Sequence, residues 1–286
     1  MVKIFRIFKI NNINHIILWL AGLGMLIPFC ILFAGSLMQR TELVEHIKPV
    51  FTGEGFASMP LWPEITTLEG YVKLLLDAPD YLYMFWNSCA IVLPSLILQT
   101  VTGTMAAWAF ARYRFPAKRL LFNLYIVLML LPFQVTMVPT YIVLDRLALL
   151  DTRAGVILSQ AFSAFSVFLL YRFFSLVPKS MIEAAQIDGA GEIYTFCHIA
   201  LPLGAPGIMS LFVLSFIELW NLVEPPMVFL KDQSLWPLSL YQVQVTQGNM
   251  DIAFAASVIT LVPPFLLFLY GQTWLEQGIQ SIGIKE

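Results

Sequence analysis

Residues 183–203 read EAAQIDGAGEIYTFCHIALPL and form a polar insert between two long apolar segments. Gly189 and Gly191 flank a break in this insert, because glycine reaches backbone conformations that end helices and has no side chain to clash. The stretch therefore predicts two short helices joined at a glycine.

The residues before this break carry helix-start signals. Pro178 suits the first position of a helix, where its missing N–H would be unpaired in any case. Ser180 is followed three residues later by Glu183, which is the spacing of a capping box. We therefore expect the first short helix to begin near residue 178.

The composition places the chain in a membrane. Apolar residues make up 59% of its 286 positions, against about 45–50% in soluble domains. A net charge of −2 argues against a nucleic-acid partner, which would favour a clustered basic excess. The three cysteines are scattered and predict neither a disulfide framework nor a metal site. The first apolar run is too long for the core of a signal peptide, so we expect it to be retained.

Six stretches are long and apolar enough to cross the hydrocarbon core, which takes about 20 residues. These predicted spans are residues 16–37, 84–110, 120–143, 154–171, 205–222 and 253–274. Ten of the 16 Lys and Arg residues fall on the inner side if both ends of the chain are cytoplasmic. The predicted organisation is a cytoplasmic segment 1–15, a six-helix transmembrane domain 16–275 with the polar loop 172–204, and a cytoplasmic tail 276–286.

Three further patterns concern the spans and the long outer loop. Gly103, Ala107 and Ala111 form a small-residue stripe for helix packing, within the chain or against another subunit. Pro132 and Pro139 predict a bend in the third span, either beside a translocation path or as a plain kink. The acidic loop 38–83 is either a landing surface for another protein or a simple connection. Its residues 68–77 predict a short amphipathic helix.

The candidate solute-path residues are polar or aromatic side chains in the spans. An ionisable group in a span costs about 2.5–3.5 kcal/mol unless it faces protein or water, which favours an inward-facing Glu218. Glu218 could instead order the helix end at the outer interface. Carboxylates, amides and an aromatic face suit sugar recognition. The candidates are Ser215, Glu218, Trp220, Asn221 and Gln134.

No enzymatic chemistry is visible in the chain. It lacks a Gly-x-x-x-x-Gly-Lys phosphate loop, a His-Glu-x-x-His zinc pair and a Gly-x-Ser-x-Gly elbow. We therefore assign no catalytic residue, no metal ligand and no cofactor to this chain. His198 lies within the polar insert, and we expect it to serve packing or a polar contact.

The polar insert resembles the EAA loop of the membrane-spanning permeases of bacterial ABC importers. Seven positions match the pattern of that loop: Glu183, Ala184, Ala185, Gly189, Ile199, Leu201 and Pro202. From about residue 15 onward the chain also resembles the smaller permease of maltose-type sugar importers. That likeness rests on Asn87-Ser88, Ala107 to Arg112, Leu131 to Val135, Asp151-Thr152, Trp220-Asn221 and Gly278.

The resemblance implies an all-α, polytopic type I ABC importer permease with six transmembrane helices and a cytoplasmic coupling helix in the EAA loop. The seven matched residues would then couple the chain to ATPase subunits; the residues alone also allow a structural hairpin. The implied partners are a second related permease, two ATPase subunits that bind ATP and Mg, an extracytoplasmic solute-binding protein, membrane lipid and a sugar.

The implied solute is a sugar, most simply an oligosaccharide, carried across a bacterial inner membrane. A permease for another polar solute such as glycerol phosphate is the alternative. An anionic solute would favour basic residues in the path, and the predicted spans contain none. From other classes, a polytopic receptor or a membrane-embedded enzyme remains open.

Overall fold

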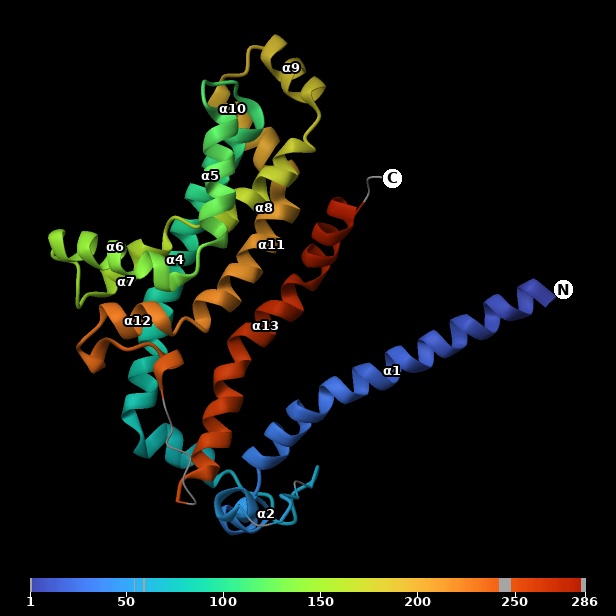
Figure 1. The fold of residues 1–286 in the computed structure, drawn as a ribbon, viewed down its shortest axis with the longest axis vertical. Helices are drawn as coiled ribbons and strands as arrows, with labels where there is room; N and C mark the ends of the chain where they lie inside the picture. Colours follow the sequence, from blue (N-terminus) through green and yellow to red (C-terminus); the bar gives the residue numbers. More distant parts are fainter. Residues whose placement is uncertain (1, 54, 59, 242–247, 284–286) are drawn as a thin grey trace. The chain divides into compact units, whose positions relative to one another are not determined.

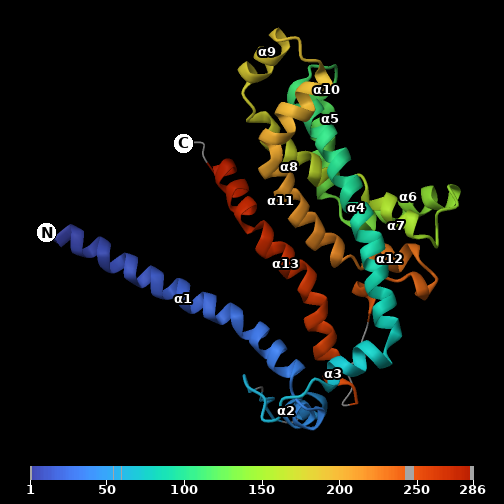
Figure 2. The same cartoon turned by 180° about the vertical axis from the view of Figure 1, so that it is seen from behind.

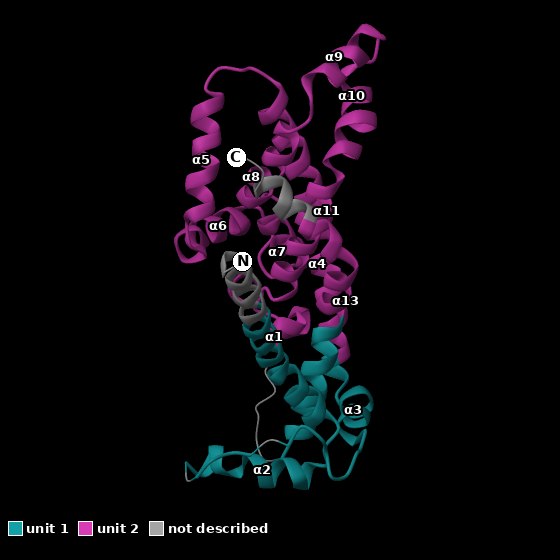
Figure 3. Cartoon of the chain, turned by 90° about the vertical axis from the view of Figure 1, so that its right-hand side faces the viewer, with its two compact units in different colours: residues 1–81, 242–262 teal, residues 82–241, 263–286 magenta. Residues whose placement is uncertain are grey.

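The computed structural model describes residues 2–53, 55–58, 60–241 and 248–283, with side chains between residues 15 and 276. These residues form helices, and the only β pairing among them is an isolated bridge between Met38 and Thr66. The predicted all-α class is therefore confirmed. The chain divides into unit 1, residues 1–81 with 242–262, and unit 2, residues 82–241 with 263–286 (Figure 3).

Most helices of the chain are short, and a few are very long (Figure 1). In chain order they are α1 (Val2–Ser36), α2 (Arg40–Thr52), α3 (Glu69–Val72), the π-helical η1 (Lys73–Asp77), α4 (Pro79–Arg112), α5 (Lys118–Leu130), α6 (Phe133–Arg146), α7 (Arg153–Gln160), α8 (Ala164–Ser175), α9 (Lys179–Ile187), α10 (Glu192–Thr195), the π-helical η2 (Phe196–Ala200), α11 (Leu201–Trp220), α12 (Glu224–Phe229), the 3₁₀ turns η3 (Gln233–Leu235) and η4 (Leu238–Leu240), and α13 (Met250–Gly283).

Five helical stretches of the described chain are long and apolar enough to cross a membrane, or six if a bent pair counts as one. The five are His15–Ser36, Pro79–Arg112, Arg153–Ser175, Glu192–Trp220 and Met250–Glu276. They match five of the six predicted spans. α1 also runs through residue 15 without interruption, so the predicted boundary there is not marked by a helix end.

The sixth predicted span, residues 120–143, is the bent pair. α5 and α6 meet at an angle of 106°. Leu131 between them is extended (ψ 127°), as expected for a residue that precedes a proline. The predicted bend is thus confirmed, as a complete break at Pro132. With a rise of about 1.5 Å per residue, the 14 residues of α6 extend about 21 Å, too short to cross a 30 Å core alone.

Small residues let α8 pack closely against two other helices of unit 2. A Cβ atom added to Gly103 of α4 would lie 2.8 Å from the Cβ of Ser166 on α8, and Ala107 is buried. A Cβ at Gly204 of α11 would lie 2.6 Å from the Phe174 ring of α8. The small-residue stripe on α4 therefore serves packing, and α8 of the same chain is its partner.

Two apolar clusters stabilise unit 2. The first joins α4, α8 and α11 and includes Trp108, Leu170 and Leu211. The second joins α4, α6, α7 and α12 through Ile91, Leu144, Val156 and Phe229. Together they fix the broken helix pair and α12 to the long helix α4.

Unit 1 holds the loop between the first two spans. Its residues 69–77 form α3 and η1, which confirms the predicted short helix, whereas α2 was not expected. α2 buries Leu43 in a cluster with Met38 and Met250. Gly53 follows α2 with φ +71°, the left-handed conformation that ends helices. Figure 2 shows α2 and α3 from behind; residues of both line one hollow.

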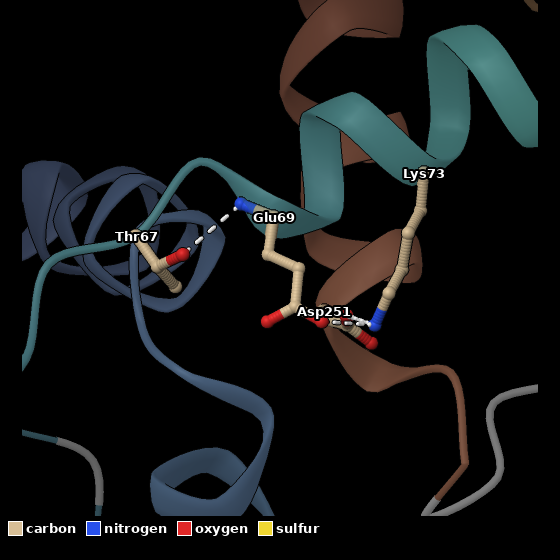
Figure 4. Close-up of polar contacts among 4 residues, drawn as sticks. All are labelled: Thr67, Glu69, Lys73 and Asp251. Carbon is tan, nitrogen blue, oxygen red and sulfur yellow. Dashed lines mark hydrogen bonds and ion pairs between the residues drawn. The ribbon is translucent and has the colours of Figure 1, made fainter.

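A partly buried ion pair ties this loop to the start of α13 within unit 1 (Figure 4). The Nζ atom of Lys73 lies 2.7 Å from the Oε1 of Glu69 and 3.2 Å from the Oδ2 of Asp251. Asp251 is only 2% exposed, whereas Glu69 is half-exposed. A Cβ atom at Gly70 would lie 2.5 Å from the Asp251 carbonyl, so the two segments are in direct backbone contact.

Candidate functional site

The candidate site begins with α9, an amphipathic helix with one buried anchor. Ile182 is 3% exposed and belongs to the cluster around Trp108. Glu183 and Ala184 face outward, and Ala185 is half-buried. Pro178 stands one position before the helix, and no side-chain hydrogen bond caps its start. The expected Pro178 start is thus off by one residue, and the expected Ser180 capping box is wrong. The side of α9 opposite Ile182 is exposed.

A glycine turn ends α9 as the sequence predicts. Gly189 has φ +84°, and its N–H donates to the Gln186 carbonyl at 3.1 Å. The N–H of Ala190 donates to the Ala185 carbonyl at 2.9 Å. This pair of bonds is the Schellman motif, in which a left-handed glycine reverses the chain. Gly191 then precedes α10 in an ordinary extended conformation. The predicted pair of short helices joined at a glycine is confirmed.

The reversal creates a hollow of about 610 Å³ between α9 and the α10–η2 segment. Three predicted coupling residues line it: Ala185, Gly189 and Ile199. Asp188, Tyr194 and His198 line it as well. The Tyr194 and His198 rings stack with centroids 4.1 Å apart, and the His198 Nδ1 lies 3.2 Å from the Tyr194 carbonyl.

The other four predicted coupling residues lie away from the hollow. Glu183 and Ala184 occupy the outward face of α9. Leu201 packs against the cluster around Trp108, and Pro202 is exposed in the first turn of α11. The seven residues therefore divide into an outward helix face, the lining of the hollow and the base of α11.

Glu192 links this helix pair to the end of α4. Its Oε2 accepts a 2.7 Å hydrogen bond from the Tyr113 hydroxyl, and its Oε1 lies 3.5 Å from the Gln186 amide. The hydrogen bond to the carboxylate raises the pKa of Tyr113, because it stabilises the protonated phenol. This hydrogen bond joins α10 to residue 113, just beyond the end of the second span.

The candidate solute-path residues on α11 do not gather in one place. Ser215 is fully buried, and its hydroxyl has no hydrogen-bond partner among the described residues. Glu218 is exposed. Trp220 is buried and stacks on Phe216 with centroids 5.5 Å apart. Asn221 lies just past the end of α11. Its amide donates to the Ile217 carbonyl at 2.8 Å. Of these four residues, only Glu218 and Asn221 are exposed.

Gln134 instead pairs with a residue that the sequence did not single out. Its Nε2 donates to the Oε1 of Glu224 at 2.6 Å, and both side chains are exposed. The contact joins the first turn of α6, just after the break, to the first turn of α12. No local pattern marks the pair, because 90 residues separate its members.

Asn87, Ser88 and Asp151 hold the connection between α12 and η4. Asp151 has φ +59°, and its Oδ1 accepts from the N–H groups of Lys231 and Asp232. The Asn87 amide donates to the Ser234 and Trp236 carbonyls, at 2.7 and 3.0 Å. The Ser88 hydroxyl accepts from the Leu238 N–H at 2.8 Å.

Polar side chains also stabilise the start of α7 and the turn at Asp232. Thr152 caps α7 by accepting from the Gly155 N–H. Hydrogen bonds from Ser234 lower the pKa of Asp232. Four residues that carry the maltose-type likeness, Asn87, Ser88, Asp151 and Thr152, thus serve local structure.

The described residues contain no group of three or more His, Cys, Asp or Glu side chains placed to hold a metal ion. An exposed helix pair is tied to α4 through Glu192 and is continuous with α11. A broken helix with polar contacts lies at another part of unit 2.

Comparisons with known proteins agree with this arrangement. Residues 99–281 match the family described as "Binding-protein-dependent transport system inner membrane component". The diacetylchitobiose uptake system permease protein NgcG of Streptomyces coelicolor is 33% identical over 237 residues, which cover 80% of this chain and 78% of that protein. The arabinooligosaccharides transport system permease protein AraQ of Halalkalibacterium halodurans is 28% identical, with 95% and 98% covered. The sn-glycerol-3-phosphate transport system permease protein UgpE of Yersinia pestis is 28% identical, with 93% and 94% covered.

A solved structure shares the fold. A chain of a bacterial ABC transporter involved in the import of the acidic polysaccharide alginate superposes with a TM-score of 0.78 at 21% identity, covering 94% of this chain and 96% of that one. This family assignment replaces the two other hypotheses, a polytopic receptor and a membrane-embedded enzyme. The chain belongs to the family of binding-protein-dependent transport system inner membrane components, and it is a permease of the ABC importer type.

Proposed function

We propose that the chain forms half of the translocation path of a sugar importer and is driven through its EAA loop by separate ATPase subunits. The observation that carries the proposal is the exposed helix α9, anchored by Ile182 and reversed at Gly189. An outward helix face beside a hollow suits docking of a second protein. The continuity of η2 with α11 gives a displaced loop a direct connection to a membrane-spanning helix.

The proposed assembly contains four other protein subunits. A second related permease closes the other half of the path, and two ATPase subunits bind ATP and Mg. An extracytoplasmic solute-binding protein delivers the solute. In support, one solved relative by fold is the alginate transporter in complex with a periplasmic protein bound to alginate pentasaccharide, with a TM-score of 0.58. In this arrangement both ends of the chain and the EAA loop are cytoplasmic.

The proposed solute is a neutral oligosaccharide. Two relatives are permeases for diacetylchitobiose and arabinooligosaccharides. The polar groups near the broken helix are the amide of Gln134 and the carboxylate of Glu224. Glu218 is a further exposed carboxylate, on α11. Carboxylates accept hydrogen bonds from sugar hydroxyls and repel anions.

Glycerol phosphate is the second candidate, because relatives of the UgpE type match over almost the whole chain. The carboxylates of Glu218 and Glu224 weigh against an anionic solute. Binding of neutral oligosaccharides and of glycerol phosphate to the cognate binding protein separates the two candidates.

Reconstitution of the complex in proteoliposomes tests the coupling role. The wild-type complex should hydrolyse ATP in response to loaded binding protein and accumulate solute. A permease that inserts normally but carries a bulky residue at position 185 should lose both activities. Normal transport by such a variant, or a label at residue 185 that reacts from the outer side, would overturn the proposal.

A further inference from the structure

The hollow beside α9 is open space that the chain itself does not fill. A Cβ atom added at Gly189 or at Gly191 would meet no other atom within 4 Å. Tyr194, on the opposite wall, is 56% exposed despite its large ring. A concave surface with a glycine floor and an exposed aromatic wall is shaped to receive a group from outside the chain.

The charge of the hollow selects the kind of group. Residues 180–202 contain three acidic side chains, Glu183, Asp188 and Glu192, and neither lysine nor arginine. Glu192 is engaged by Tyr113. The Asp188 carboxylate has no hydrogen-bond or ion-pair partner among the described residues, and it lines the hollow. An incoming cation would therefore find an acceptor already in place.

The stacked rings favour a guanidinium over an ammonium group as the incoming cation. Tyr194 and His198 lie nearly parallel, with an interplanar angle of 15°. A planar guanidinium can stack on such a surface while it donates two parallel hydrogen bonds to a carboxylate, which an ammonium group cannot do. At about 610 Å³ the hollow also has room for the backbone turn that carries the side chain.

We propose that this hollow receives an arginine side chain of the ATPase subunit, paired with the Asp188 carboxylate and stacked on the Tyr194–His198 rings. The inference rests on the proposed coupling function and gives its docking site a second contact, separate from the outward face of α9. In this complex the EAA loop is held on two sides, so it follows the ATPase in both directions of its motion.

Two substitutions test the hollow without disturbing the fold. Asp188→Asn removes the charge and keeps the shape. Gly191→Leu fills the hollow, and the chain tolerates it because Gly191 has an ordinary φ of −71° and open space around it. Gly22→Leu, on α1 where an added Cβ atom also meets nothing within 4 Å, is the matched control for size. Asp77→Asn, at an exposed position in unit 1, is the matched control for lost charge.

Binding of the purified ATPase to the permease pair in nanodiscs gives the first readout. We expect Asp188→Asn to weaken binding about tenfold at low salt, with a smaller difference at 0.5 M salt, because screening weakens the pair. Gly191→Leu should weaken binding at every salt concentration, and both controls should bind like the wild type. Wild-type affinity in both test variants would overturn the inference.

Chemical protection identifies the cation. Phenylglyoxal, which modifies arginine, should spare one ATPase arginine in the wild-type complex and modify it in the Asp188→Asn complex. Protection of a lysine from acetylation in place of an arginine would overturn the arginine assignment. If the wild-type permease pair does not bind the ATPase at all, the proposed function itself fails. If the wild type binds the ATPase and both test variants bind it with the same affinity, only the proposed role of the hollow is refuted.

Discussion

Lys73 and Asp251 are 178 residues apart in the sequence and form an ion pair, with Nζ 3.2 Å from Oδ2. The carboxylate side chain is 3% exposed and the lysine side chain 30%. The pair fastens the helical segment of the first outer loop to the start of α13 within unit 1. Burial of the Asp251 carboxylate costs free energy of folding unless it is paired, because a carboxylate removed from water needs a partner.

Lys73→Met should therefore destabilise the protein by about 1–3 kcal/mol. The loss stays below the roughly 3–5 kcal/mol of a fully buried pair because the lysine remains partly in water. Unfolding in mild detergent measures the effect. Asp251→Asn in the Lys73→Met background should restore part of the stability, since it removes the unpaired charge. Equal stability of Lys73→Met and the wild type would show that water solvates Asp251.

Gly189 and Gly191 should respond in opposite ways to substitution. At φ +84°, Gly189→Pro cannot keep the turn, because proline fixes φ near −65°. We expect it to abolish uptake and solute-stimulated ATP hydrolysis while the protein still inserts. Gly191→Ala, at φ −71°, should keep both activities. Uptake assays with expression controlled by immunoblot compare the two; active Gly189→Pro would refute the importance of the reversal.

Tyr113 should make stability depend on pH at the alkaline end. Its pKa is raised in the folded state by the hydrogen bond to Glu192, so this contribution is present below the ordinary tyrosine pKa of about 10. The contribution is lost as the pH rises through the higher folded-state value. Tyr113→Phe should cost about 0.5–1 kcal/mol at pH 7.

The difference in unfolding free energy between wild type and Tyr113→Phe, followed from pH 8 to pH 11, measures this effect. It should shrink as the pH rises, because only the wild type loses the contact. A difference that stays constant over this range would argue against a contribution from the hydrogen bond.

Gly207 should not accept a larger residue, because a Cβ atom there would collide with the Phe173 ring of α8. Gly207→Ala is expected to cost about 1–3 kcal/mol through overpacking between α11 and α8. Gly24→Ala on α1, where a Cβ meets nothing within 4 Å, is the matched control and should be neutral or slightly stabilising. Thermal unfolding of the two variants side by side decides the point.

Substitution of Gln134 should affect solute uptake more than ATP hydrolysis. Gln134→Ala removes the amide that bonds Glu224 near the break, so we expect KM for uptake to rise several-fold with little change in basal ATP hydrolysis. Thr136→Ala is the control, because the Thr136 hydroxyl bonds the Phe133 carbonyl of its own helix. Unchanged uptake kinetics in Gln134→Ala would remove this residue from the path.

How far the sequence predicts the structure depends on how local each signal is. The turn at Gly189 and the break at Pro132 follow from single residues with restricted backbones, and both were predictable. α2 was missed because it is polar and amphipathic and buries little beyond Leu43, so it lacks the long apolar run that marks a span.

Side-chain partners were harder to foresee than helices. The sequence predicted both Ser215 and Glu218 as solute-path residues, but the fold buries Ser215 and leaves Glu218 exposed. The Gln134–Glu224 contact and the hollow around Asp188 depend on how distant segments or a reversed helix pair come together. Such contacts leave no periodic pattern in the sequence.

The break at Pro132 has a consequence for the order of assembly. Phe133, the first residue after it, packs on Phe229 with ring centroids 6.1 Å apart. That aromatic contact can form only once the ribosome has added residue 229. α6 is too short to cross the membrane by itself, and 83 residues separate its last residue, 146, from residue 229, so this contact forms only after they have been synthesised.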